Sequence, residues 1–239
     1  QFSVSGTSDV YNGSGIDSAG QYGETAAFLP AQRSRKVIID PGHGGADGGA
    51  VSITGVYESK INLQISNRLD MIFGLYGTPA VMTRSAEEID YPSEADTIRK
   101  KKVADQKARV ELINSFENAV LISIHQNKFP ASSPSGAQVF YNSVEGSREI
   151  GESIQNVLVS SLDQKSGRVA SLIPDSIYLM NKAQCPGVLV ECGFLSNPGE
   201  AGLLQTEEYQ IKIASCIFSG YASIARVNDM DGYGGTNEE

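Results

Sequence analysis

The stretch Ala119-Val-Leu-Ile-Ser-Ile124 decides the fold, because it is apolar at every position but one. Such a run, rich in β-branched residues, is typical of a central strand that is covered on both faces. Lys36-Val-Ile-Ile-Asp40 is a similar run that stops at Pro41-Gly42, the pattern of a buried strand ending in a turn. Val188-Leu-Val-Glu191 is a third run of this kind. We therefore expect a sheet with buried central strands.

The segments around these runs alternate between strand and helix patterns. Further strands are predicted at residues 80–83, 138–141 and 177–180. Helices are predicted at residues 61–73, 98–116, 147–162 and 209–225, where apolar residues recur on one face. This alternation predicts an α/β fold: a single twisted, mostly parallel or mixed sheet of about six strands, with helices on both faces. Ligands of such sheets bind beyond the carboxyl ends of the strands.

Composition narrows the class of protein. The chain of 239 residues carries a net charge of −9, and an acidic surface repels phosphate backbones, so nucleic acid is excluded as a partner. No apolar run approaches the ~20 residues of a membrane-spanning helix, so no transmembrane segment is expected in this chain. The three cysteines, Cys185, Cys192 and Cys216, contain no C-x-x-C pair, which argues against a disulfide framework or a thiolate zinc site.

The two ends differ from the middle of the chain. Residues 1–34 are rich in Gly, Ser and Thr without a sustained period, which predicts a flexible leader or linker of the kind that follows an upstream anchor. Residues 227–239 have too little apolar surface to pack and predict a disordered tail. The catalytic domain is therefore expected at residues 35–226.

Only two histidines occur in the chain, and each follows a predicted central strand. His43 comes three residues after Asp40, and His125 directly follows Ile124. A single histidine is more often structural than a ligand, but two at one sheet edge favour a metal site, and imidazole suits zinc. A catalytic zinc usually takes a third protein ligand, for which Glu58 qualifies. For Glu58 taken alone, a charge that stabilises the start of the next helix is the favoured alternative.

Glu191 is the second carboxylate of interest, because it ends a predicted central strand. A carboxylate there costs several kcal/mol of desolvation unless it is paired or functional. Beside a metal it can take a proton from water and pass it to a leaving group. A salt bridge to Arg84 or Arg109 is an equally good interpretation. Cys192 is a weaker candidate nucleophile, because no histidine is near it in sequence and buried free cysteine packs as a small hydrophobe.

Two other patterns carry less information. The glycines of residues 42–49 resemble a phosphate loop, but Asp47 stands where the last glycine of G-x-G-x-x-G would be, and the chain has no G-K-[ST]. The basic run of residues 99–102 is interpreted as the solvated face of a helix in preference to a binding patch.

The chain resembles the zinc-dependent N-acetylmuramoyl-L-alanine amidases of type 3, which cleave peptidoglycan. The matching segments follow the family order across residues 36–225: Ile39-Asp-Pro-Gly-His-Gly-Gly-Ala-Asp47, Gly55-Val-Tyr-Glu58, Met82-Thr-Arg84, Arg109 with Asn114, Ser123-Ile-His-Gln-Asn127, Ser135-Gly-Ala-Gln-Val-Phe-Tyr141 and Val190-Glu-Cys-Gly-Phe-Leu-Ser-Asn197. Phe129-Pro130 and the run that ends at Tyr141 are most similar to spore-cortex members. Gln126 departs from the small residue that most members carry there.

The resemblance implies a zinc ion held by His43, Glu58 and His125, with Glu191 as the catalytic carboxylate. It implies hydrolysis of the amide between N-acetylmuramic acid and L-alanine, which in spore-cortex members leads toward muramic-lactam. Asn127 and Arg84 are predicted to contact the substrate, Asn127 as a donor to the developing oxyanion.

Alternatives and partners complete the prediction. Another zinc peptidase, acting on the stem peptide, would use the same ligands; a non-catalytic wall-binding module would have lost some of them, whereas all four residues are present. Ligands on separate, loop-bordered segments bind zinc weakly until they are ordered, so we expect a regulatory or accessory protein partner beside peptidoglycan. The substrate implies an extracytoplasmic location, in the cell envelope or developing spore, reached through a signal or anchor upstream of this sequence.

Overall fold

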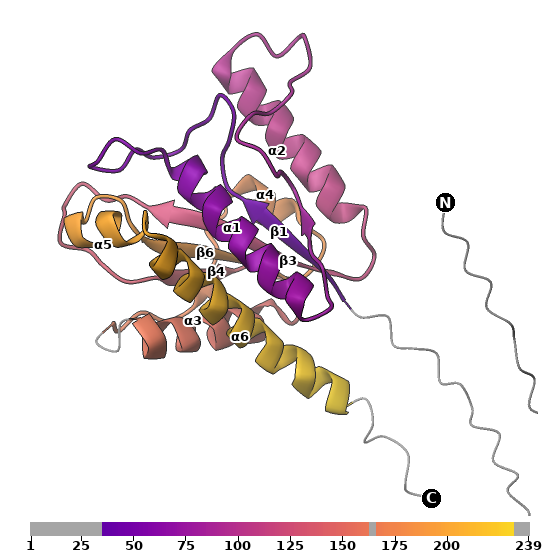
Figure 1. The fold of residues 1–239 in the computed structure, drawn as a ribbon. Coiled ribbons are helices and arrows are strands. Elements are labelled where there is room, and N and C mark those ends of the chain that lie inside the picture. The colour runs from indigo at the N-terminus through magenta and orange to yellow at the C-terminus, as the bar shows by residue number, and fades with distance from the viewer. Residues whose placement is uncertain (1–34, 163–165, 232–239) are drawn as a thin grey trace, which may run out of the picture. The chain divides into compact units, whose positions relative to one another are not determined.

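A computed structural model describes residues 35–162 and 166–231, which form a six-stranded mixed sheet with helices packed on it (Figure 1). The strand order is β2-β1-β3-β6-β4-β5. The strands are β1 (Lys36–Pro41), β2 (Val81–Met82), β3 (Ala119–Asn127), β4 (Gln138–Tyr141), β5 (Ser171–Leu172) and β6 (Gly187–Phe194). The predicted fold class is confirmed.

Helices cover both faces of this sheet. They are α1 (Glu58–Leu75), α2 (Ile98–Asn114), α3 (Ser147–Leu162), α4 (Tyr178–Lys182), α5 (Pro198–Leu203) and α6 (Glu207–Asp231). On one face α1, α3 and α6 pack against Val120, Ile122 and other strand residues, and Figure 1 shows α1 beside α6 there. On the other face α2 and α4 pack against Leu121 and Leu189. Because successive strand residues point to opposite faces, the apolar run of β3 supplies both layers.

One predicted strand is a helix. Residues 177–180 were expected to extend, but they contain the start of α4, whose Leu179 and Met180 are buried in the core. Asn181 donates from its side chain to the carbonyl oxygens of Pro174 and Ile177, at 3.0 and 2.9 Å, which closes the helical turn. A short apolar run fits either element. β4 pairs with β6 on one side and with β5 on the other, and the two residues of β5 are too few to show a period.

The end of α6 also differs from the prediction. This helix continues to Asp231, so residues 227–231 of the expected tail are helical. After Gly220 the next glycine in the sequence is Gly232, and helices commonly end just before a glycine. The predicted linker at residues 1–34 and the remaining tail at residues 232–239 lie outside the described residues. Within the described ranges, no helix is both long and apolar enough to cross a bilayer.

Strand direction creates the edge that matters for function. β3 runs parallel to its two neighbours, β1 and β6, so the carboxyl ends of these three strands lie on one side of the sheet. His125 of β3 stands opposite Glu191 of β6 in the register, and a bulge then places Asn127 opposite Phe194. The polar strand ends expected from the sequence therefore lie together.

Candidate metal centre and active site

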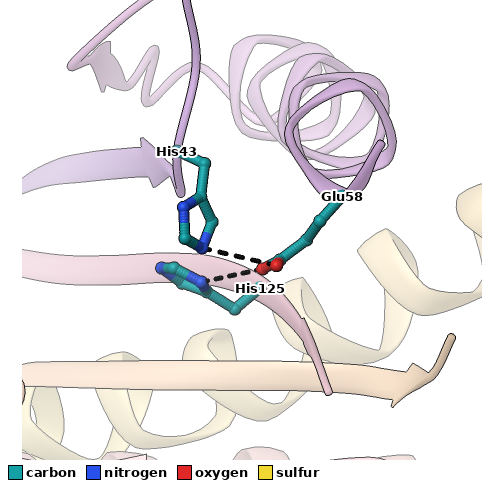
Figure 2. Close-up of side chains that lie close together, drawn as sticks. All are labelled: His43, Glu58 and His125. Carbon is teal, nitrogen blue, oxygen red and sulfur yellow. Dashed lines mark hydrogen bonds and ion pairs between the residues drawn. The ribbon is translucent and has the colours of Figure 1, made fainter. Parts of the chain in front are cut away.

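Two imidazoles and one carboxylate meet at this edge (Figure 2). One ligand atom from each of His43, Glu58 and His125 lies within 4.8 Å of the other two. Nε2 of His43 is 3.3 Å from Oε2 of Glu58, and Nδ1 of His125 is 3.0 Å from Oε1. The two rings stand edge to face, with centroids 5.0 Å apart. This is a donor set that can hold a divalent metal ion.

Glu58 is the centre of this group. It is the first residue of α1, it is buried, and its carboxylate accepts backbone N–H bonds from Ala50 at 2.9 Å and from Gln126 at 3.1 Å. Burial alone would raise the pKa of Glu58, but the hydrogen bonds from His125 and His43 outweigh it and hold that pKa far below its usual range. Its position at a helix start agrees with the alternative interpretation, but that interpretation does not account for two imidazoles.

The backbone that carries His43 is in an unusual conformation. His43 has a φ of 60°, the only positive φ outside glycine in the described part of the chain. Such a conformation is disfavoured for a residue with a Cβ and persists only when its surroundings enforce it. Arg84 Nε and Arg109 Nη2 each donate to the His43 carbonyl oxygen at 2.7 Å. Both guanidinium groups also donate to the Pro41 carbonyl oxygen.

Arg84, which the sequence predicted to contact the substrate, is held by backbone carbonyl oxygens. Its buried guanidinium also donates to the carbonyl oxygens of Gly42, Ser59 and Ala86, and the residue does not line the cavity described below. These contacts make it a residue that holds the loop after β1. A contact between Arg84 and substrate stays a prediction.

Arg109 is anchored by a buried ion pair. Its Nη1 donates to Asp40 at 2.9 Å, and Thr83 and Ser123 donate their hydroxyls to the same carboxylate at 2.7 Å each. Burial opposes ionisation of Asp40, but the Arg109 charge and the two hydroxyls lower its pKa. An ionised Asp40 therefore fixes the guanidinium that reaches the His43 carbonyl.

Asp47 orients the His43 ring. Nδ1 of His43 lies 2.9 Å from Oδ2 of Asp47, which leaves Nε2 toward Glu58. Lys102 Nζ lies 2.9 Å from the same Asp47 oxygen. The hydrogen bond with His43 lowers the pKa of Asp47, burial opposes this, and Lys102 adds to the lowering. Although burial lowers the pKa of His43, Asp47 and Glu58 together raise it to about 9. A carboxylate on the remote nitrogen is a common partner of a metal-binding histidine.

Two glycines are required by the close approach of the ligands. A Cβ on Gly42 would overlap the His125 ring. A Cβ on Gly49 would lie 2.6 Å from Oε2 of Glu58, and Gly49 has a φ of 69° as well. The glycine-rich segment therefore clears space around the ligands, a role the phosphate-loop comparison did not suggest.

Glu191 faces the same edge, directly across from His125. Its Oε2 is buried and has no hydrogen-bond partner among the described residues. Burial, opposed by His125 and reinforced by Glu58, raises the pKa of Glu191 to about 7. The alternative of a salt bridge fails, because Arg109 pairs with Asp40 and Asp105 while Arg84 bonds backbone carbonyls. An unpaired carboxylate beside a metal site is well suited to proton transfer.

The three candidate metal ligands and Glu191 line one cavity of about 350 Å³. Its walls come from Lys102, Asp105 and Gln106 on α2 and from Ser176, Ile177 and Tyr178 at the start of α4. Lys102 belongs to the basic run that was interpreted as a solvated face, so for this residue the interpretation is incomplete. Asn127 lies at the end of β3 and is not among the lining residues. Its contact with substrate stays a prediction.

Cys192 is excluded as a nucleophile by its surroundings. Its side chain is buried in the core, and burial raises the pKa of its thiol well above the usual range. A thiol kept protonated in this way is inert.

Sequence reasoning missed several residues of the site. Asp47 was considered as a break in a glycine pattern and as the end of a family segment, but not as a partner of His43, which it follows by four residues. Asn62 was not considered, although it follows Glu58 by one helical turn and lies on the same helix face. Once His43 and Glu58 are taken as metal ligands, each of these four-residue spacings indicates a hydrogen-bond partner for the ligand.

Comparison with known proteins agrees with the family resemblance seen in the sequence. The family described as N-acetylmuramoyl-L-alanine amidase matches residues 37–223. The chain belongs to this amidase family. The germination-specific N-acetylmuramoyl-L-alanine amidase of Bacillus subtilis is 38% identical to it over 189 residues, which are 78% of each protein.

Solved structures of amidases have the same fold. The CwlD amidase from Clostridioides difficile, in complex with the GerS lipoprotein, aligns with a TM-score of 0.75 and 36% identity, over 80% of this chain and 99% of that one. An N-acetylmuramoyl-L-alanine amidase from Clostridium difficile 630 aligns with a TM-score of 0.70 and 28% identity, over 81% and 97%. The predicted family is confirmed, and the likeness extends to CwlD.

Proposed function

We propose that this amidase is zinc-dependent and hydrolyses the amide between N-acetylmuramic acid and the first L-alanine of the peptidoglycan stem peptide. The observation that carries the proposal is the juxtaposition of His43, Glu58 and His125 with the unpartnered carboxylate of Glu191. Family membership supplies the substrate class.

The donor set fits zinc. Two neutral imidazoles and one carboxylate form a common set for catalytic zinc, which leaves a fourth position for water or substrate. The atoms already lie close together, and Asp47 and the loop carbonyl contacts hold His43 in place. When bound, the ion would polarise the amide carbonyl and lower the pKa of water toward 7.

Glu191 would move the protons. Its pKa of about 7 lets it accept a proton from the attacking water and then donate it to the departing nitrogen of L-alanine. Its position opposite His125 puts the carboxylate beside the ligands while keeping it out of their hydrogen bonds. Asn127, two residues beyond His125, is our proposed donor to the developing oxyanion.

The cavity wall suggests how an anionic stem peptide would be held. Among its described lining residues, only Lys102 and Arg109 have fixed positive charges. Arg109 is buried on Asp40, Asp105 and the loop carbonyls, whereas the Lys102 side chain is 45% exposed. An ammonium has three donors and Asp47 takes one, so we expect Lys102 to meet a substrate carboxylate.

The biological setting follows from the relatives. One is named germination-specific and another was solved with a lipoprotein, so we propose a role in processing spore-cortex peptidoglycan and an accessory protein that orders the metal site. Such work takes place outside the cytoplasmic membrane, in the cell envelope or developing spore.

A digest of purified peptidoglycan tests the proposal. The wild-type protein with zinc should release stem peptides whose amino terminus is L-alanine, and a chelator should abolish the release. Mass analysis that finds cleavage within the stem peptide would favour the zinc peptidase instead. Binding of wall fragments without any cleavage, at full zinc content, would favour a wall-binding module.

A further inference from the structure

Asn62 joins the three segments that carry the metal ligands. It lies one turn after Glu58 in α1 and is completely buried. Its Nδ2 donates to the carbonyl oxygen of Gly42 at 3.1 Å and to Oε1 of Glu58 at 3.3 Å. Its Oδ1 accepts from Nε2 of Gln126 at 3.1 Å. Gly42 precedes His43 and Gln126 follows His125, so one amide connects Glu58 itself with the neighbours of the two histidines.

Gln126 completes this connection, but one of its own polar atoms is left unpaired. Its backbone N–H donates to Oε1 of Glu58, and its side chain is directed to Asn62. The side-chain Oε1 is buried without a hydrogen-bond partner among the described residues. Leaving a buried acceptor unpaired costs about 1–3 kcal/mol, which an apolar residue of similar shape would avoid. Simple packing therefore does not explain a glutamine here.

We propose that Asn62 and Gln126 are positioning residues that set the spacing of the three metal ligands and thereby the affinity for the metal. The inference rests on the proposed zinc site. The ligands come from a loop, a helix start and a strand, and no continuous element joins them. Directional hydrogen bonds from one rigid amide to all three segments hold a spacing that apolar contacts cannot specify.

The experiment compares Asn62→Ala and Gln126→Met with Ser66→Ala. Met keeps the unbranched shape of Gln126 while removing its amide. Ser66 lies one turn beyond Asn62 on α1 and is equally buried, but its Oγ has no hydrogen-bond partner in the described chain, so it is a matched control. Zinc affinity is measured by competition with a chromophoric chelator, and ligand geometry by the absorption spectrum of the cobalt-substituted protein.

We expect Asn62→Ala to weaken zinc binding about 10–100-fold and to change the cobalt spectrum. Gln126→Met should weaken it less, with an effect in the double variant smaller than the sum of the two. Ser66→Ala should match the wild type. Unfolding of the metal-free proteins is followed in parallel, and if Asn62→Ala does not fold, Gln126→Met alone decides.

The outcomes separate this inference from the proposed function. If folded variants of Asn62 and Gln126 bind zinc as tightly as the wild type with an unchanged cobalt spectrum, the positioning role is wrong although the zinc site stands. If the wild type itself binds no zinc, the proposed function fails first.

Discussion

The loop after β1 and the helical layer formed by α1, α3 and α6 are held by different forces. The layer is built from apolar side chains, such as Ile122 and Leu69, that fill space without directional bonds. The loop is built from polar contacts: the carbonyl oxygens of Pro41, Gly42 and His43 each accept hydrogen bonds from two side chains. This fold therefore places its elements by burial and its reactive groups by hydrogen bonding.

The largest effect is expected for substitution of Glu191, which should change the reaction rate and not the stability of the fold. Glu191→Gln should lower kcat by about 10²–10⁴-fold, because the amide cannot accept and return a proton. Zinc content and thermal unfolding should stay near the wild-type values. Near-normal turnover of peptidoglycan fragments by the variant would show that proton transfer does not depend on Glu191.

The next effect is expected at the anchor of the loop. Arg109→Met leaves Asp40 buried without its cation, which should cost about 3–5 kcal/mol of unfolding free energy in urea. The deficit should shrink on acidification, since the lowered pKa of Asp40 depends on Arg109 and the variant can protonate the carboxyl. Arg148→Met is the control, because its pair with Glu152 is exposed to solvent and should contribute little to the unfolding free energy. If the two variants lose the same unfolding free energy, the buried pair of Arg109 holds the loop no more strongly than an exposed pair does.

Zinc affinity should depend on pH through His43. Its pKa in the metal-free protein is raised to about 9, and zinc binds the neutral ring, so binding displaces a proton below that pH. The measured affinity should rise about tenfold per pH unit between pH 7 and 8 and level off above pH 9. Asp47→Asn removes a cause of the raised pKa and should move the plateau to lower pH. An affinity that is flat over this range would argue against proton displacement from His43.

The smallest effect is expected in the apolar layer. Ile122→Val removes one methylene group from a fully buried site and should cost about 0.5–1.5 kcal/mol of unfolding free energy. Zinc affinity and turnover of the folded protein should not change. A shift in zinc affinity as large as that expected for Asn62→Ala would mean that packing, too, sets the ligand spacing.

The sequence predicted the layer well and the loop poorly for the same reason. Burial leaves a period along the chain, so β4 and α3 were predicted at their observed bounds. The run at residues 177–180 failed because four apolar residues contain too little of any period. The contacts of Arg84 and Arg109 with His43 join residues 41 and 66 positions apart, and such pairs leave no local pattern. The ligands were found because histidine is rare here and strand ends converge.

The two walls of the cavity belong to connections between strands, α2 between β2 and β3 and α4 between β5 and β6, whereas the metal ligands lie at strand ends and at the start of α1. Mutations can therefore change the length, charge or sequence of either cavity wall without moving the metal ligands. On this fold, recognition of the cell-wall polymer and the hydrolytic centre can therefore evolve independently of each other.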